Sequence, residues 1–209
     1  MKEKEPQSRY AKPLQVGKMT RGDIIKLVVI LAAAAVAAVL FFYLRSGQGY
    51  HLEDWQQAAL EDTGVTLLVP GEVRYGQQPE SPFAYSKQDA LGVQVWRYEI
   101  PSEDMEDLQA VYEQFIGEVN TPGSYNASSE EEGWQFAQPD YAISQRTDYP
   151  HVDGVGLGDD RNCFFSVVPV GEETWVVWLS SEGSTGSVFK TMRFMDMAKE
   201  YFDQIQVAA

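Results

Sequence analysis

Residues 27–44 read LVVILAAAAVAAVLFFYL, eighteen consecutive residues without a charge, a glycine or a proline. An α-helix rises about 1.5 Å per residue, so the run covers about 27 Å, close to the roughly 30 Å apolar core of a bilayer. Ile24, Ile25 and Lys26 precede the run, and a lysine amine reaches the headgroups while its stem stays in the apolar layer. The sequence therefore predicts one transmembrane helix over residues 24–44.

A cleaved signal peptide, a lipoprotein anchor and a buried core helix all fit this apolar run less well. A cleaved signal peptide carries an apolar stretch of about 7–15 residues and then a small-x-small site. Here the run is longer, and SGQG at 46–49 makes a poor cleavage site. No cysteine stands just after the run, which excludes a lipoprotein anchor. A buried core helix fits less well, because this one is apolar on every side and lies beside a polar tail. We favour a retained signal-anchor.

The charges that flank the run predict its direction. Only Arg45 follows it closely, and Glu53 and Asp54 come next. Basic residues stay on the cytoplasmic side of a membrane span. The sequence thus predicts a single-pass protein of a bacterial cell membrane, with a cytoplasmic N-terminus and an extracytoplasmic C-terminal domain. The basic residues that precede the run are Lys2, Lys4, Arg9, Lys12, Lys18, Arg21 and Lys26.

The four predicted segments differ in composition. Residues 1–23 form a disordered basic tail, 24–44 the membrane helix, 45–50 a linker and 51–209 one α+β domain. Residues 46–209 hold eight basic and 28 acidic residues, a net charge of −20. Such a surface repels phosphate backbones, which argues against nucleic-acid binding. It attracts cations or a basic partner, and it equally keeps an exported domain soluble.

Periodicity in the domain predicts an antiparallel sheet with helices on one or both faces. Three helices are expected at 52–62, from an N-cap at Ser102 to 119, and in the C-terminal segment with a buried side marked by Val188, Met192, Met195, Phe202 and Ile205. Loops are expected at 120–133 and 148–161. Strands are expected at 65–69, 83–87, 91–100, 134–138 and 141–147, followed by a hairpin of 162–170 with 173–181.

This order of elements resembles the PsbP-like α/β/α sandwich of exported bacterial lipoproteins and thylakoid lumen proteins. The resemblance is one of pattern, it covers most of the external part, and it transfers no functional residue. The long acidic loop departs from the family's order. The similar pieces are GVTLLVP (64–70), VQVWRYEI (93–100), the 103–119 helix, ETWVVWLSS (173–181) and the closing YFDQI (201–205).

Few residues are candidates for chemistry. The two histidines, His51 and His151, stand in a linker and a loop without a nucleophile signature, so no catalytic residue is predicted. The single cysteine, Cys163, lies beside two phenylalanines and is expected to be buried. The stretch DGVGLGDD offers Asp153, Asp159 and Asp160 as weak calcium candidates, although EF-hand spacing is absent. No cofactor is predicted.

A domain with a large hydrophobic core and no cluster of catalytic residues suggests a protein that recognises a partner through its surface. The sequence therefore predicts a membrane-anchored accessory or binding domain that meets another envelope or membrane protein. Two alternatives stay open, a carboxylate-based envelope hydrolase and a calcium-responsive acidic domain. The hydrolase would need two carboxylates facing each other in a cleft, and the calcium domain would respond to calcium but not to magnesium.

Overall fold

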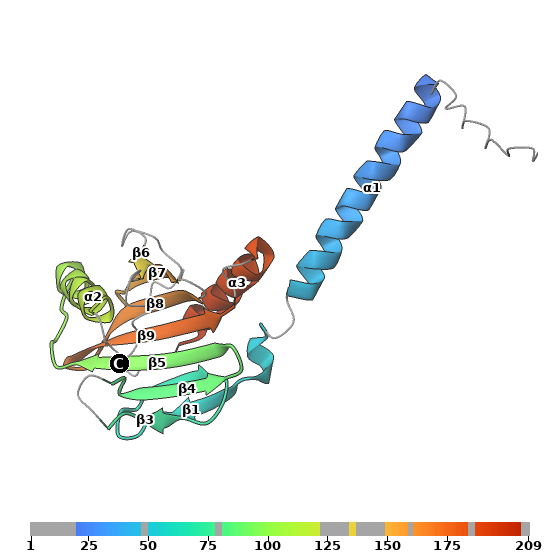
Figure 1. The fold of residues 1–209 in the computed structure, drawn as a ribbon. Coiled ribbons are helices and arrows are strands. Elements are labelled where there is room, and N and C mark those ends of the chain that lie inside the picture. Colours follow the sequence, from blue (N-terminus) through green and yellow to red (C-terminus); the bar gives the residue numbers. More distant parts are fainter. Residues whose placement is uncertain are drawn as a thin grey trace, which may run out of the picture. The chain divides into compact units, whose positions relative to one another are not determined.

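The computed structural model describes residues 20–46, 50–77, 81–121, 134–136, 149–158, 161–183 and 187–205. The chain divides into two compact units, Met1–Phe41 and Phe42–Ala209, and each is described by itself. The first unit holds most of helix α1, and the second holds the α+β domain (Figure 1). The predicted loop at 120–133, apart from its first two residues, and the predicted strand at 141–147 lie outside the described residues.

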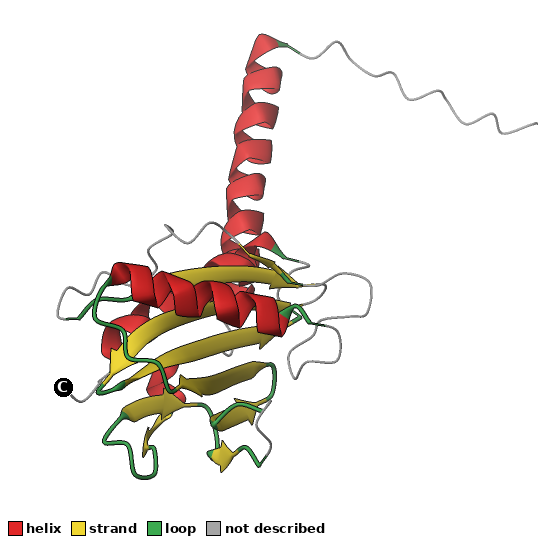
Figure 2. Cartoon of the chain, turned by 90° about the vertical axis from the view of Figure 1, so that its left-hand side faces the viewer, coloured by secondary structure: helices red, strands yellow, loops and turns green. Residues whose placement is uncertain are grey.

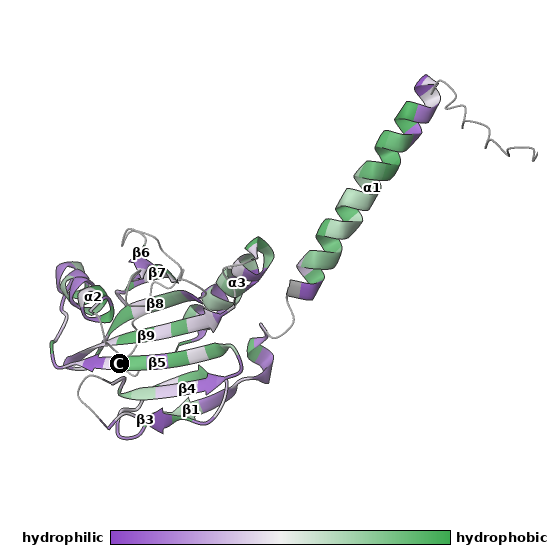
Figure 3. Cartoon of the chain, in the orientation of Figure 1, coloured by the Kyte–Doolittle hydropathy of each residue, from purple (hydrophilic) through white to green (hydrophobic). Residues whose placement is uncertain are grey.

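Helix α1 spans Arg21–Ser46, slightly more than the predicted 24–44. It begins early because Thr20 and Asp23 cap each other. The backbone N–H of Thr20 donates to Asp23 Oδ2 at 3.1 Å, and the backbone N–H of Asp23 donates to Thr20 Oγ1 at 3.3 Å. The 25 residues Arg21–Arg45 are long and apolar enough to cross a membrane. Figure 3 shows the apolar colour running along the helix, with polar residues at its two ends.

The domain is built on a twisted antiparallel sheet in the order β3-β4-β5-β9-β8-β7-β6. Its centre is the hairpin that the sequence predicts at 162–170 and 173–181, which is confirmed and turns at Gly171 with φ 61°. Strand β5 pairs with β9 from Leu91–Ser181 to Tyr98–Thr174. The bounds are β3 Arg74–Tyr75, β4 Ala84–Gln88, β5 Leu91–Tyr98, β6 Gln135–Phe136, β7 Val152–Gly158, β8 Arg161–Val170 and β9 Glu173–Glu182.

Both faces of this sheet are covered, which confirms the predicted α+β class. Helix α2, Met105–Val119, lies across one face and contacts β7, β8 and β9 (Figure 2). Helix α3, Val188–Gln204, and a two-stranded sheet of β1, Gln56–Ala59, with β2, Thr66–Val69, supply the core of the other face. Alternation along β5 therefore buries both sides, Val93 and Val95 toward α3 and Tyr98 toward α2.

Helix α2 keeps the predicted buried stripe but not the predicted cap. Asp104 is the N-cap, and its Oδ1 accepts from the backbone N–H groups of Glu106 at 2.8 Å and Asp107 at 3.1 Å. Ser102 is instead within hydrogen-bond distance of Thr174, with 2.6 Å between the two hydroxyl oxygens. The helix thus starts later than expected, because the side chain of Ser102 is used by β9.

The predicted helix at 52–62 is wrong. A single 3-10 turn at Leu52–Asp54 is followed by strand β1, which pairs with β2 from Gln56–Val69 to Ala59–Thr66. The short β2 needs a partner for its backbone groups, and the chain before it folds back to supply one. The turn between them uses Asp62 at φ 58° and Gly64 at φ 72°. Tertiary pairing has overridden a helix-like spacing.

The predicted loop at 148–161 is also wrong for half of its length, because Val152–Gly158 form strand β7. Its glycines accommodate bulky neighbours. A Cβ on Gly154 would lie 2.1 Å from Cζ of Phe165, and one on Gly156 would lie 2.6 Å from Sγ of Cys163. The glycine-rich composition therefore reflects close packing against β8 rather than a free loop.

The predicted buried side of α3 is correct only in its C-terminal half. Val188 is 74% exposed and Met192 is 44% exposed. At about 100° per residue, Met192 lies about 120° around the helix from the buried Ala198. The buried residues of the helix and its end are Phe194, Met197, Ala198, Tyr201, Phe202 and Ile205.

Candidate functional site

The first calcium candidate, Asp153, lies inside strand β7 rather than on a loop. Its carboxylate is buried on the α3 side of the sheet, and its cross-strand partner is Ser166. Asp159 and Asp160 lie outside the described residues. Of the three candidates the structure describes only Asp153, so the calcium site stays a prediction.

His151 makes the contact that comes nearest to catalytic geometry. Its Nε2 lies 3.7 Å from Asp153 Oδ2, and its Nδ1 lies 3.3 Å from the carbonyl oxygen of Tyr149. In a hydrolytic triad the histidine stands between the carboxylate and the hydroxyl. Ser166 is the cross-strand partner of Asp153. Among the described residues, His151 contacts Tyr149 and Asp153, and these contacts include no serine, threonine or cysteine that could serve as a nucleophile.

Cys163 is completely buried in the core under α2, as expected. Burial raises the pKa of its thiol well above the usual 9.0, and the hydrogen bond from Gly156 and the charge of Arg161 oppose this effect only in part. Because the thiolate is the reactive form, this cysteine is a packing residue.

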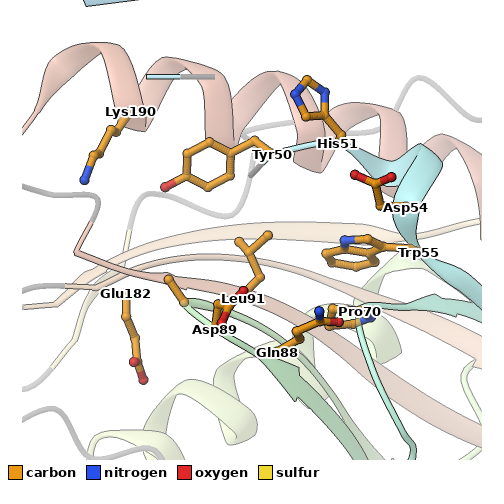
Figure 4. Close-up of a pocket in the computed structure, with 11 residues that line it drawn as sticks. Tyr50, His51, Asp54, Trp55, Pro70, Gln88, Asp89, Leu91, Glu182 and Lys190 are labelled. Atoms are coloured by element: carbon orange, nitrogen blue, oxygen red, sulfur yellow. The ribbon is translucent and has the colours of Figure 1, made fainter. Parts of the chain in front are cut away.

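Two cavities flank the turn between β4 and β5, one on each face of the sheet. We call the first the acidic cavity. It has a volume of about 410 Å³ and lies on the α3 side (Figure 4). Asp54 and Asp89 bring carboxylates to it, Lys190 brings an ammonium group, and the ring of Trp55 forms part of the wall. The other described lining residues are Tyr50, His51, Pro70, Gln88, Ala90, Leu91 and Glu182.

Several contacts hold the acidic cavity in shape. The hydroxyl oxygens of Tyr50 and Ser181 are 3.0 Å apart, so Tyr50 belongs to the domain rather than to the predicted linker. The Trp55 ring meets Tyr201 edge-on, with 5.7 Å between ring centroids. Lys190 Nζ donates to the carbonyl oxygen of Gly183 at 3.3 Å. These hydrogen bonds and aromatic contacts hold the lining residues of the acidic cavity in place.

We call the second cavity the basic cavity. It has a volume of about 360 Å³ and lies on the α2 side, at the end of the sheet that holds the turn between β4 and β5. Arg74, Lys87 and Arg161 bring positive charge to it from β3, β4 and β8. The remaining described lining residues are Tyr85, Ser86, Ala90, Gly92, Gln94, Trp134, Trp178, Ser180 and Glu182.

Both cavities include Ala90 and Glu182, so the same short piece of chain separates them. The backbone N–H of Glu182 donates to the carbonyl oxygen of Ala90 at 2.8 Å, which fixes the turn to the end of β9. The side chain of Glu182 accepts from Lys87 Nζ at 2.8 Å. The Glu182 carboxylate therefore lies with Lys87 on the α2 side of the sheet, in the basic cavity.

Sequence reasoning missed both cavities, because their residues are far apart in the chain. Arg74, Lys87 and Arg161 are single basic residues inside ordinary strand patterns, and only the pairing of β3 with β4 and of β8 with β9 brings them to one place. The alternation of residues along 91–100 puts Gln94 on the side of Trp96, and the pairing of β4 with β5 then adds Tyr85 and Lys87 to that side. Without the strand order, this alternation could not show that these residues line one cavity.

No protein-family model matches the chain, and no curated protein matches it. The resemblance to PsbP-like sandwiches therefore stays a prediction.

Proposed function

We propose that the chain is a single-pass, membrane-anchored accessory protein whose extracytoplasmic domain binds a basic segment of another envelope protein. Helix α1 provides the anchor by its length and composition. The excess of Lys and Arg before α1 supports a cytoplasmic N-terminus. In this proposal the domain serves recognition rather than catalysis.

The acidic cavity carries the proposal. The carboxylates of Asp54 and Asp89 beside an aromatic wall suit a lysine or arginine side chain, since the carboxylates accept its hydrogen bonds and the ring faces its stem. The net charge of −20 beyond residue 45 would attract a basic partner before contact. Tyr50 follows the end of α1 by four residues, about 14 Å at most, so a partner bound here is also close to the anchor.

Photo-crosslinking of the full-length chain in its host cells tests the proposal. A photoreactive phenylalanine analogue replaces His51, which is exposed and lines the acidic cavity, or Gln109, which is exposed on α2. We expect one specific protein adduct from position 51 and none from position 109. Equal adducts from both positions, or none from either, would contradict a partner at the cavity.

Charge-neutral variants sharpen this experiment. Asp54→Asn with Asp89→Asn removes two carboxylates from the cavity, and asparagine tolerates the positive φ of 52° at position 89. We expect the adduct from position 51 to fall about tenfold, as loss of charge-assisted hydrogen bonds implies. The matched control Glu113→Gln, exposed on α2, should leave the adduct unchanged.

Topology has its own test. Protease added to intact cells should digest the C-terminal domain, because it stands outside. Protection in intact cells combined with digestion after permeabilisation would invert the proposed orientation.

A further inference from the structure

On the α2-side face of the sheet, β3, β4 and the first residues of β5 carry no helix among the described residues, whereas Trp96 and Tyr98 further along β5 contact Phe115 and Glu118 on α2. Helix α2 contacts β7, β8 and β9, and Figure 2 shows it crossing that part of the face. The side chains that point from the remaining strands toward this face are polar at their tips, whereas those under α2 are aromatic and aliphatic. A sheet face with such a division has one packed half and one half available to a ligand.

Positive charge gathers on the available half. Eight basic residues follow residue 45, and three of them, Arg74, Lys87 and Arg161, line the basic cavity. Glu182 is the one carboxylate among its described lining residues. The cavity is therefore locally positive within a domain that is strongly negative. Such a local reversal favours an anion and holds it against the surrounding field.

The cavity is deep at its base because two residues with small side chains are paired there. Gly92 on β5 pairs with Ser180 on β9, and a Cβ on Gly92 would lie 3.2 Å from Ser180 Oγ. Lys87 pairs with Gly92 from the other side, and its side chain reaches across β5 to Glu182 on β9. That reach is possible because neither Ala90 nor Gly92 raises a large side chain in between.

The cations are held to different degrees. Arg161 lies over the ring of Trp134, with 5.1 Å from its Cζ to the ring centroid, so its position is fixed by stacking. Arg74 is exposed and makes no ion pair with a described residue. The Lys87–Glu182 pair is 56% and 48% exposed, so it is weak and can open to another anion.

We propose that the basic cavity binds a small organic anion through a carboxylate or phosphate group. Arg74 and Arg161 supply guanidinium donors to the anionic oxygens, and Lys87 exchanges Glu182 for the ligand. Ser180 and Gln94 face the rest of the ligand with a hydroxyl and an amide. The volume of about 360 Å³ is in the range of small-molecule sites and suits one ring-sized compound.

Titration calorimetry on the full-length chain in detergent micelles tests this site with three probes that share a sugar ring. Glucuronate carries a carboxylate, glucose 6-phosphate carries a phosphate, and glucose carries no charge. At constant ionic strength we expect saturable binding of at least one anionic probe and none of glucose. The stronger anion identifies the group that the cavity prefers. Absence of binding by both anions, or equal binding of glucose, overturns the proposal.

Charge variants should shift the affinity in opposite directions. Arg74→Gln should lower the affinity for the anion about tenfold, as loss of a charge-assisted hydrogen bond implies. Glu182→Gln should raise the affinity for the anion about two- to fivefold, because the anion no longer competes with Glu182 for Lys87. Lys199→Gln, on α3, is the matched control and should change nothing. A Glu182→Gln variant that binds more weakly would contradict the exchange of Lys87.

A steric variant keeps the charges intact. Gly92→Val raises a branched side chain from the floor of the cavity, and valine suits a strand. We expect anion binding to be lost while the circular dichroism spectrum is retained. If the variant fails to fold, the Arg74→Gln and Glu182→Gln pair still decides the question. The Asp54→Asn and Asp89→Asn changes in the acidic cavity should leave anion binding in place, so the two sites fail independently.

Discussion

Gly154 is the residue at which one added atom should cost most. Its missing side chain leaves room for the ring of Phe165 on the neighbouring strand, and a Cβ there would lie 2.1 Å from Cζ. Neither the ring nor the backbone of β7 can move far in a packed core. We expect Gly154→Ala to lower the free energy of unfolding by about 1–3 kcal/mol, measured by urea denaturation of the full chain in micelles.

Gly117 provides the matched control for that prediction. It is exposed on α2, and a Cβ built on it meets nothing within 4 Å. Gly117→Ala should therefore raise the free energy of unfolding by about 1 kcal/mol, the helix propensity difference. If both alanine variants shift stability in the same direction, the close packing at Gly154 does not govern its effect.

Tyr201 buries a hydroxyl without a described hydrogen-bond partner. Burial raises the pKa of this phenol, so the group stays protonated and its desolvation is not compensated. We expect Tyr201→Phe to raise the melting temperature, by an amount corresponding to about 1 kcal/mol. A lower melting temperature would show that the hydroxyl has a partner that it needs.

At the scale of elements, α2 depends on Asp104 for its start. The carboxylate accepts from two backbone N–H groups of the first turn. Asp104→Ala should lower the free energy of unfolding by about 1 kcal/mol, whereas Asp104→Asn should largely keep the cap. Urea denaturation measures both variants. Equal losses of unfolding free energy in the two would assign the effect to charge rather than to capping.

The contact between β5 and β9 includes an ion pair with a predictable response to acid. Arg97 Nε donates to Glu173 Oε2 at 2.8 Å, and the indole N–H of Trp175 donates to the same oxygen at 2.8 Å. The hydrogen bonds from Arg97 lower the pKa of Glu173 below its usual 4.5, partial burial opposes them, and the bond from Trp175 adds to the lowering. The carboxylate is therefore more acidic in the folded state than in the unfolded state.

A lowered pKa contributes stability above the unfolded value, and the contribution is lost as the pH falls through the folded value. We expect Glu173→Gln to remove part of the loss of stability below about pH 4.5, by at most about 1 kcal/mol because the pair is partly exposed. Thermal melts from pH 7 to pH 3 measure it. An unchanged acid response in Glu173→Gln would contradict this role.

Sequence periodicity was sufficient for elements whose pattern does not depend on a partner. The β8–β9 hairpin has its own turn at Gly171, and α2 has a stripe of large apolar residues at spacings of three and four. Residues 56–59 are different, because their strand exists only where β2 offers unpaired backbone. Gly154 and Gly156 looked like loop residues until Phe165 and Cys163 were placed opposite them. These features depend on long-range pairing that no local window contains.

At the scale of the whole molecule, both cavities also depend on long-range strand pairing, so the sequence alone did not predict them. Glu182 and Lys87 are 95 residues apart in the chain, yet they touch across β5. A charge count gives the sign of the domain but not the place where the sign reverses. The strand order had to be known before Arg74, Lys87 and Arg161 became neighbours.

The charge of the domain also leads to a prediction about divalent cations. A net charge of −20 destabilises the folded state by self-repulsion, which any bound or screening cation relieves. We expect millimolar calcium and magnesium to raise the melting temperature equally. A rise with calcium alone, lost in Asp159→Asn with Asp160→Asn, would instead establish the calcium site predicted from the sequence.

The two outermost strands of the large sheet have a further consequence. Among the described residues, β3 and β6 are each two residues long. An anchored protein meets its own copies far more often in the plane of a bilayer than in free solution. Short borders give such copies few backbone groups on which to extend the sheet, so crowding at the surface should not lead to fibre-like stacking.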